Sequence, residues 1–334
     1  MTEEAPGRAL RDEYDALLLD LDGVVYAGGD AIAHAVEALD EARRAGLHLA
    51  FVTNNASRTP EAVADLLCSL GVKADAAEVA TSAQAAARVL ADLPPGSPVL
   101  VAGGLGLWAA VESAGLRAVS TADAGPVAVV QGYGPDIGWR ELAEVTVAVR
   151  AGARWVATNL DTTIPSERGI LPGNGTLVAA VASALGRGPD VVAGKPARPL
   201  HDEAVARSGA ARPLVVGDRL DTDIEGANAV GADSLLVLTG VSRPAELVTA
   251  AREQRPTYVG ADLRALGEPG RVAAAASGVG WTTSVHDDRI TLEGAGDPIE
   301  ALRAVLALSW PLVDNGRRPI VEVPAALADW WASS

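Results

Sequence analysis

Near its start the sequence reads Leu17-Leu18-Leu19-Asp20-Leu21-Asp22-Gly23, an apolar run that ends in two acidic side chains and a glycine. The apolar residues predict a short buried strand of the kind found in parallel sheets. Two carboxylates this close repel each other unless a cation or a proton lies between them, and burial increases that repulsion. We therefore expect a metal ion at the carboxyl end of this strand.

Apolar strand-like runs alternate with helical patterns along the rest of the chain. Strands are expected at residues 17–21, 48–52, 99–101, 127–130, 155–157, 191–193, 214–216 and 234–238. Helices are expected at residues 32–45, 60–70 and 82–93, among others. This alternation predicts an α/β fold with a doubly wound, Rossmann-like parallel sheet and helices on both of its faces. Functional residues are then expected in the loops at the carboxyl ends of the strands.

Three polar motifs follow later strands of this predicted sheet. They are Thr53-Asn54-Asn55, Ala193-Gly194-Lys195-Pro196 and Gly217-Asp218-Arg219-Leu220-Asp221-Thr222-Asp223-Ile224. Short hydrogen-bond donors at a helix entrance are suited to phosphate oxygens, and an ammonium held in a stiff turn offsets negative charge. Each motif also has an ordinary explanation, as a helix cap or as a solvated charge. Their joint occurrence, each at a strand end, favours a functional site.

The overall composition limits the classes of partner. The 334 residues include 43 acidic and 27 basic side chains, a net charge of −16, without a basic run, so neither nucleic acid nor a membrane surface is expected as a partner. No stretch approaches the about 18 uninterrupted apolar residues of a membrane span, so a soluble protein is expected. The single cysteine, Cys68, excludes an internal disulfide and fits a reducing cytoplasm. The length suggests two domains and a small appendage.

Taken together, the four motifs resemble those of the haloacid dehalogenase superfamily of phosphatases. The resemblance is to its 4-nitrophenylphosphatase-like subclass, which carries a large cap between the second and third motifs. Thr81-Ser82-Ala83 is similar to the hinge of that subclass. The resemblance implies a catalytic core of residues 1–80 and 191–266 and an inserted α/β cap of residues 81–190. It ends near residue 266.

The resemblance also implies the chemistry of a magnesium-dependent phosphoric monoester hydrolase. Asp20 would be the nucleophile that forms an aspartyl-phosphate, and Asp22 would be the general acid and base. The Asp20 carboxylate, the Asp22 backbone carbonyl and Asp218 would hold Mg²⁺, for which Mn²⁺ or Co²⁺ can substitute. Asp223 would support the metal through a water, with Asp221 as the alternative.

The phosphate of the substrate would be bound by the remaining motif residues, which are Thr53, Asn54, Asn55 and Lys195. Within the superfamily, the group of D-glycerol-3-phosphate phosphatases is the most similar. The evidence is a C-terminal extension and the segments Pro165-Ser166-Glu167-Arg168-Gly169 and Arg219-Leu220-Asp221-Thr222-Asp223. That likeness implies hydrolysis of the small metabolite D-glycerol 3-phosphate to glycerol and phosphate.

Other functions stay open at this point. Phosphoglycolate or another small phosphorylated metabolite is the nearest alternative substrate. A sugar phosphotransferase or mutase is a second alternative, because it would form the same aspartyl-phosphate and pass it to a sugar. A non-catalytic binding module is a third, against which the intact acidic and lysine motifs argue.

The inserted cap contains one long segment between predicted elements and two tryptophans. In the cap, residues 159–175 are expected to form a long loop facing the substrate. Asp161, Glu167 and Arg168 are candidates for contacting a substrate hydroxyl, although solvated charges are the favoured interpretation of each. Trp139 and Trp155 are expected to pack inside the cap.

Residues 267–334 resemble a truncated acetyltransferase-like α/β tail. A strand pair is expected over residues 281–293, a helix over 298–313 and a strand over 320–323. The segment 291–296 lacks the Gln or Arg that opens the usual coenzyme A loop, so we expect a structural or interface role. The cap and the tail are candidate surfaces for formation of a homo-oligomer.

Overall fold

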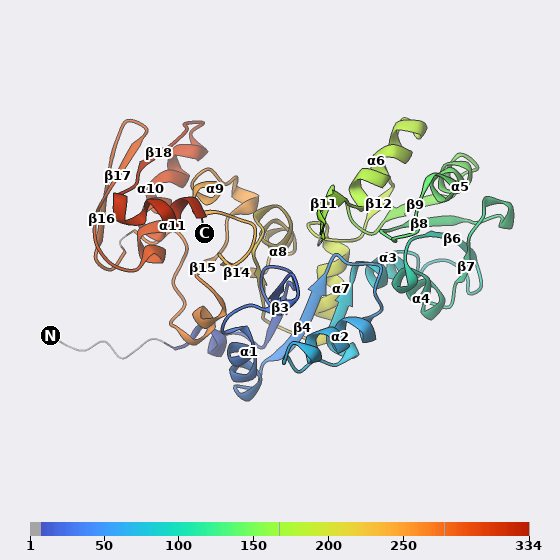
Figure 1. Cartoon of the computed structure of the whole chain (residues 1–334), viewed down its shortest axis with the longest axis horizontal. Helices are drawn as coiled ribbons and strands as arrows, with labels where there is room; N and C mark the ends of the chain where they lie inside the picture. Colours follow the sequence, from blue (N-terminus) through green and yellow to red (C-terminus); the bar gives the residue numbers. More distant parts are fainter. Residues whose placement is uncertain (1–7, 167, 277, 334) are drawn as a thin grey trace. The chain divides into compact units, whose positions relative to one another are not determined.

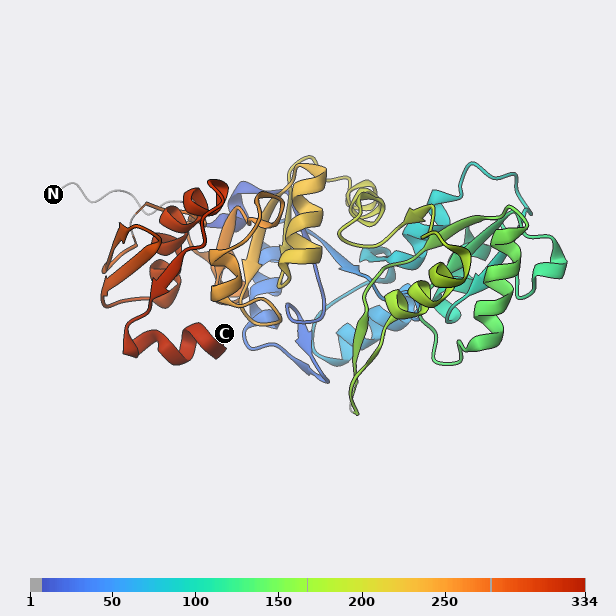
Figure 2. The same cartoon turned by 90° about the horizontal axis from the view of Figure 1, so that it is seen from above.

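The computed structural model describes residues 8–166, 168–276 and 278–333 (Figures 1 and 2). The chain divides into two compact units, each of which is described by itself. The first consists of Met1–Leu49 and Ala210–Ser334, and the second of Ala50–Gly209. Over the described residues, no helix is both long enough and apolar enough to cross a membrane.

A parallel sheet forms the centre of the first unit. Its strands are β1 (Ala16–Leu19), β13 (Pro213–Gly217), β14 (Asp233–Val237) and β15 (Tyr258–Gly260), in the order β15-β14-β13-β1. All four residues of β1 are buried, and Leu17 lies beside Leu214 of β13. β4 (His48–Thr53) starts next to β1, where the His48 N–H donates to the carbonyl oxygen of Asp15. The predicted parallel α/β sheet is confirmed.

Short helices and one small hairpin surround this sheet. They are η1 (Leu10–Glu13), β2 (Tyr26–Ala27), β3 (Asp30–Ala31), α1 (Ala35–Arg44), η4 (Leu220–Ile224), α8 (Glu225–Val230), α9 (Pro244–Val248), η5 (Arg252–Gln254) and η6 (Leu263–Gly267). α1 begins later than the expected Ile32 because His34 has a φ of 67°, in the left-handed region that no α-helix contains.

The C-terminal tail is a three-stranded sheet with two helices, in agreement with the elements predicted from its sequence. Its elements are β16 (Trp281–His286), β17 (Arg289–Gly294), α10 (Pro298–Asp314), β18 (Ile320–Glu322), η7 (Ala325–Leu327) and α11 (Ala328–Ser333). β17 pairs antiparallel with β16 and parallel with β18. α10 packs against β16 and β17, and both α10 and α11 also contact α9. The tail, in orange and red, therefore lies against the neighbouring core elements in both views (Figures 1 and 2).

In the second unit, β4 pairs in parallel with β5 (Val79–Thr81), as the last two strands of the sheet order β15-β14-β13-β1-β4-β5. A second parallel sheet has the order β12-β9-β8-β6-β7. The strands of this second sheet are β6 (Pro98–Ala102), β7 (Arg117–Val119), β8 (Ala128–Gln131), β9 (Arg154–Ala157) and β12 (Val191–Val192). The helices are α2 (Pro60–Ser69), η2 (Ala76–Glu78), α3 (Ser82–Val89), α4 (Leu105–Ser113), η3 (Ala122–Ala124), α5 (Trp139–Arg150), α6 (Asn174–Leu185) and α7 (Arg198–Ser208).

Two expectations for the cap are wrong. The segment expected to be a loop contains an antiparallel hairpin, β10 (Thr163–Ser166) with β11 (Gly169–Pro172), closed where the Ser166 hydroxyl donates to the Gly169 carbonyl oxygen. Gly169 has a φ of 102°, which lets the chain reverse there. Glu167 lies outside the described residues.

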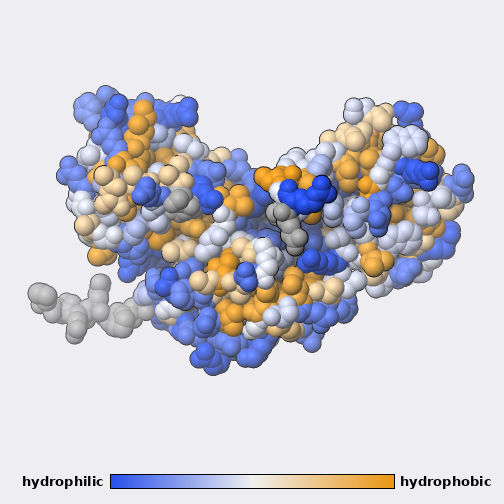
Figure 3. Space-filling model, viewed as in Figure 1, coloured by the Kyte–Doolittle hydropathy of each residue, from blue (hydrophilic) through white to orange (hydrophobic). Residues whose placement is uncertain are grey.

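The second correction concerns the tryptophans. Trp155 is fully buried, as expected, but Trp139 is 80% exposed because it is the first residue of α5 and precedes the buried stripe of that helix. Ile170 of β11 is exposed as well. Hydrophobic residues in the face drawn in Figure 3 form separate groups among hydrophilic ones.

Candidate active site

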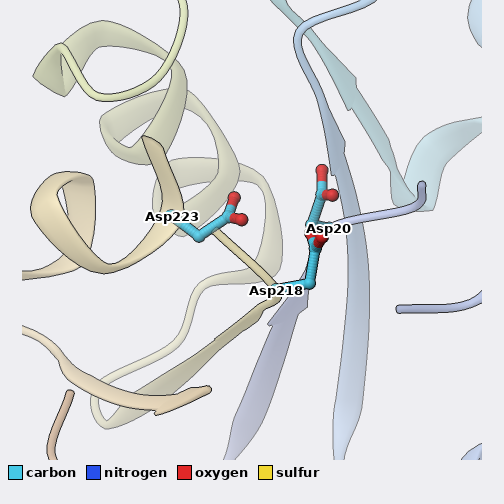
Figure 4. A group of neighbouring side chains, drawn as sticks. All are labelled: Asp20, Asp218 and Asp223. Atoms are coloured by element: carbon cyan, nitrogen blue, oxygen red, sulfur yellow. The ribbon is translucent and has the colours of Figure 1, made fainter. Parts of the chain in front are cut away.

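Three carboxylates meet at the carboxyl edge of the sheet in the first unit (Figure 4). Asp20 follows β1, Asp218 follows β13 and Asp223 lies in η4, and each offers an oxygen within 4.8 Å of the other two. Asp218 and Asp223 are buried, at 0% and 1% exposure. Buried like charges need a cation between them, and three carboxylates are the hard oxygen donors that Mg²⁺ prefers. The residues present therefore fit a magnesium ion.

Backbone groups orient the two buried carboxylates. The Val241 N–H donates to Oδ2 of Asp218 at 2.7 Å, and the Arg219 N–H donates to Oδ2 of Asp223 at 3.1 Å. Asp221 instead pairs with the guanidinium of Arg219 at 2.8 Å and is largely exposed. Of the two acids that the sequence left as alternatives, Asp223 is thus the one placed beside Asp20 and Asp218.

Asp22 lies in the turn that follows Asp20 and is exposed. The Tyr26 hydroxyl approaches Oδ2 of Asp22 at 3.4 Å. The turn depends on Gly23, which has a φ of 84° and whose N–H donates to the Tyr26 carbonyl oxygen at 2.8 Å. A Cβ at this glycine would also collide with the Asp218 carboxylate. The glycine of the opening motif is therefore required by the packing of the turn against the Asp218 carboxylate.

The second unit brings Asn54 and Lys195 together. The Asn54 side chain accepts the Lys195 N–H at 2.8 Å and donates to the Lys195 carbonyl oxygen at 3.1 Å. The Lys195 ammonium is 4% exposed and donates to the carbonyl oxygen of Val52, in β4, at 3.2 Å. The lysine motif and the amide motif, about 140 residues apart in sequence, are thus joined by direct hydrogen bonds.

Thr53 and Asn55 shape the loop that follows β4. The Thr53 hydroxyl accepts the Asn55 N–H at 3.1 Å. The Asn55 side-chain oxygen accepts the N–H groups of Ser57 and Arg58, at 2.9 and 3.1 Å, which folds the loop into a tight turn before α2. These bonds preorganise the loop, and its contact with phosphate stays a prediction.

The sequence interpretation missed the residues that hold Asn54 from the cap. Asp161 was expected to be solvated, but its Oδ2 accepts a hydrogen bond from the Asn54 amide at 3.1 Å. The Asn54 carbonyl oxygen accepts bonds from the Asn159 amide at 2.8 Å and from the Ser82 hydroxyl at 2.6 Å. The available signal was the position of Asn159 and Asp161 directly after β9, where a parallel sheet presents functional side chains.

Comparison with known proteins gives the family. A family model described as haloacid dehalogenase-like hydrolase matches residues 17–117, and a second, HAD-hydrolase-like model matches residues 192–266. The D-glycerol 3-phosphate phosphatase of Mycobacterium tuberculosis is 46% identical over 325 residues, which are 94% of this chain and 91% of that protein. The acid sugar phosphatase of Staphylococcus haemolyticus is 37% identical over 75% of this chain and 94% of its own.

Solved structures agree. The glycerol phosphate phosphatase of Mycobacterium tuberculosis in complex with magnesium matches with a TM-score of 0.89 and 45% identity, over 98% of this chain and 100% of that chain. The p-nitrophenyl phosphatase of Archaeoglobus fulgidus matches with a TM-score of 0.70 and 31% identity, over 76% of this chain and 98% of its own. The chain therefore belongs to the haloacid dehalogenase-like hydrolases, and the expected class of phosphoric monoester hydrolase is confirmed.

Proposed function

We propose that this protein is a magnesium-dependent phosphatase that hydrolyses D-glycerol 3-phosphate to glycerol and phosphate. The observation that carries the metal-dependent chemistry is the group of Asp20, Asp218 and Asp223, whose carboxylate oxygens lie within 4.8 Å of one another. The relative of that name, 46% identical over 94% of the chain, supports the choice of substrate.

Two residues at the end of β1 perform the covalent chemistry. An oxygen of Asp20 forms a bond to phosphorus while the bond from phosphorus to the ester oxygen breaks, and Asp22 gives a proton to the departing alkoxide. Asp22 then takes a proton from a water molecule whose oxygen attacks the phosphorus of the aspartyl-phosphate. This second displacement releases phosphate and restores Asp20.

The other motif residues bind the metal ion and the phosphate. Magnesium, held by Asp20, the backbone carbonyl of Asp22 and Asp218, with Asp223 in support, supplies positive charge that offsets the carboxylates and the phosphate. An all-oxygen donor set of this kind also accepts Mn²⁺ or Co²⁺.

Lys195 contributes a fixed positive charge that offsets the charge of the phosphate. Thr53, Asn54 and Asn55 present the hydrogen-bond donors of a preorganised loop to the phosphate oxygens. The hydrogen bonds that join Asn54 to Lys195 support this role, because they hold the loop and the lysine in one geometry.

The domain organisation that we propose is the one expected from the sequence. In it, residues 1–80 and 191–266 are the catalytic core, residues 81–190 are the cap that excludes bulk water, and residues 267–334 are the tail. The enzyme acts in the cytoplasm on a free metabolite, without nucleic acid or membrane as partner. Copies of the chain associate through the cap or the tail.

A panel of phosphate esters tests this function. Phosphate release is measured from D-glycerol 3-phosphate, L-glycerol 3-phosphate, phosphoglycolate and a hexose phosphate, each with magnesium and with a chelator. We expect release that requires magnesium and is fastest for D-glycerol 3-phosphate. Faster release from phosphoglycolate or the hexose phosphate would overturn the substrate, and metal-independent release would overturn the mechanism. Transfer of the phosphoryl group to an added sugar in preference to water would indicate a phosphotransferase.

A further inference from the structure

The tail shares one apolar cluster with the elements that carry the metal-binding carboxylates. Leu220 and Ile224, at the two ends of η4, flank Asp223 in sequence and are buried in this cluster. Residues of α9 and of the tail complete the same cluster, and they are Leu247, Val248, Ile290, Leu302, Val305, Leu306, Trp310, Leu327 and Trp331. The packing of η4 and α9 therefore depends on side chains that lie beyond the region matched by the family models, which ends at residue 266.

The segment between β14 and α9 encloses the Asp218 carboxylate. The Val241 N–H donates to Oδ2 of Asp218 at 2.7 Å, and the Ser242 N–H donates to the Asp218 carbonyl oxygen at 3.1 Å. The Ser242 hydroxyl accepts the N–H of Leu220, the first residue of η4, at 3.1 Å. Gly240 lies so close to the carboxylate of Asp218 that a Cβ there would collide with it. A shift of this segment would therefore displace both Asp218 and the start of η4.

α9 follows this segment directly and is bonded to the tail. The Trp310 indole N–H donates to the carbonyl oxygen of Leu247, in α9, at 2.8 Å, and both groups are buried. The guanidinium of Arg255 lies over the Trp310 ring, 5.0 Å from its centre, and bonds Asp314 of α10 at 2.8 Å. One buried hydrogen bond thus fixes α9 against α10, and the ion pair of Arg255 fixes the segment after η5 against the same helix.

Hydrogen bonds therefore link α10 to α9, and the segment before α9 to Asp218. We propose that the tail is a positioning element of the magnesium site, in which Trp310 holds α9 and, through residues 240–242, the carboxylate of Asp218. This inference rests on the proposed function, since it takes Asp218 to be a magnesium ligand. This chain is longer than some phosphatases of similar fold: 76% of it matches 98% of the Archaeoglobus fulgidus phosphatase. Here the tail covers the helix that supports a metal ligand.

The tail's own sequence fits this supporting role. The N-terminus of α10 is capped by Asp297, whose carboxylate accepts the N–H of Ile299 at 2.9 Å, and the Trp281 indole N–H donates to the Asp297 carbonyl oxygen at 3.0 Å. A carboxylate thus occupies the helix terminus where an acetyltransferase-like fold would receive an anionic cofactor.

A pair of matched substitutions tests the proposal. Trp310→Phe removes the indole N–H bond to α9, whereas Trp281→Phe removes a similar bond within the tail from a second buried tryptophan of the same cluster. Magnesium chloride is titrated calorimetrically into the metal-free full-length proteins without substrate, and thermal unfolding is recorded for each. We expect Trp310→Phe to raise the Kd for magnesium by about threefold to tenfold, and Trp281→Phe by less than about twofold, at comparable losses of Tm.

The outcomes separate the hypotheses. An unchanged magnesium Kd in Trp310→Phe, with a lowered Tm, would show a merely structural tail and overturn the proposal. Equal rises in both variants would overturn it as well, because the effect would then not pass through α9. If Trp310→Phe does not fold, Asp314→Asn, which weakens the bonds of Arg255 and Arg252 to α10, is expected to raise the Kd by about twofold, and no change would count against the proposal. A wild-type protein that does not bind magnesium would instead refute the proposed function itself.

Discussion

The motif residues of the two units differ in how their side chains are held together. In the first unit, three carboxylates lie within 4.8 Å of one another, and two of them are buried. In the second unit, an amide lies between residues of opposite charge and bonds both, as Asn54 bonds the backbone of Lys195 and the carboxylate of Asp161. A cation would offset the charge of the first group, whereas hydrogen bonds join the members of the second group directly. Substitutions and metal should therefore affect the two groups differently.

The largest effect is expected at the nucleophile. Asp20→Asn leaves an amide that cannot attack phosphorus, so kcat for D-glycerol 3-phosphate should fall by about 10⁴-fold or more. Steady-state phosphate release checks this. Asp221→Asn is the control, because this exposed acid pairs only with Arg219 among the contacts described for it, and it should keep kcat within about twofold. Substantial turnover by the Asp20 variant would assign the covalent step to another residue.

Magnesium should stabilise the first group and leave the second unaffected. At about 100 times its Kd, magnesium should raise the free energy of unfolding by about 2.7 kcal/mol, measured by denaturant titration against a chelator-treated sample. Asn54→Ala weakens the second group and should show the same gain, since Asn54 holds no metal. If magnesium did not raise the free energy of unfolding of Asn54→Ala, binding of the metal to the first group would depend on the second group.

A smaller effect on activity is expected where Asp161 bonds the loop that follows β4. Asp161→Ala removes the acceptor of the Asn54 amide and should lower kcat/KM by about tenfold, because the loop and Lys195 lose a fixed geometry. Asp161→Asn keeps an acceptor oxygen and should stay within about threefold of wild type. The magnesium concentration for half-maximal activity should not change in either variant. Equal losses in both would attribute the effect to the charge of Asp161, and not to its hydrogen bond.

The smallest effect concerns acid stability of the tail. Hydrogen bonds from Arg255 and Arg252 lower the pKa of Asp314 from its ordinary 3.8 to about 2. Because the folded pKa is the lower one, this ion pair contributes stability above pH 3.8 and loses it as the pH falls through about 2. Asp314→Asn should therefore lower Tm slightly at pH 7, and calorimetry should show the difference shrinking between pH 4 and pH 2. A difference that is constant over this range would contradict the assignment.

The sequence predicted the elements on which the site depends because their signals are local. The apolar run of β1, the helix pattern of α2 and the strands of the tail depend on residue spacing within a few turns. The motifs that contain the acids and Lys195 were found in the same way, since each motif follows a strand. The hairpin of residues 163–172 and the exposure of Trp139 were not foreseen, because short turns and the start of a helix carry weak periodicity.

By itself, the sequence determined the kind of chemistry: the α/β sheet, the acids at its edge and the loop that follows β4. Tertiary structure alone decided which groups meet. It placed Asp223 and not Asp221 beside Asp20, joined Asp161 to Asn54, and brought Trp310 of the tail onto α9. The physical reason is distance along the chain. Periodicity and turn chemistry act over a few residues, whereas a contact such as that of Trp310 with Leu247, 63 residues apart, exists only once separate elements have packed into one core.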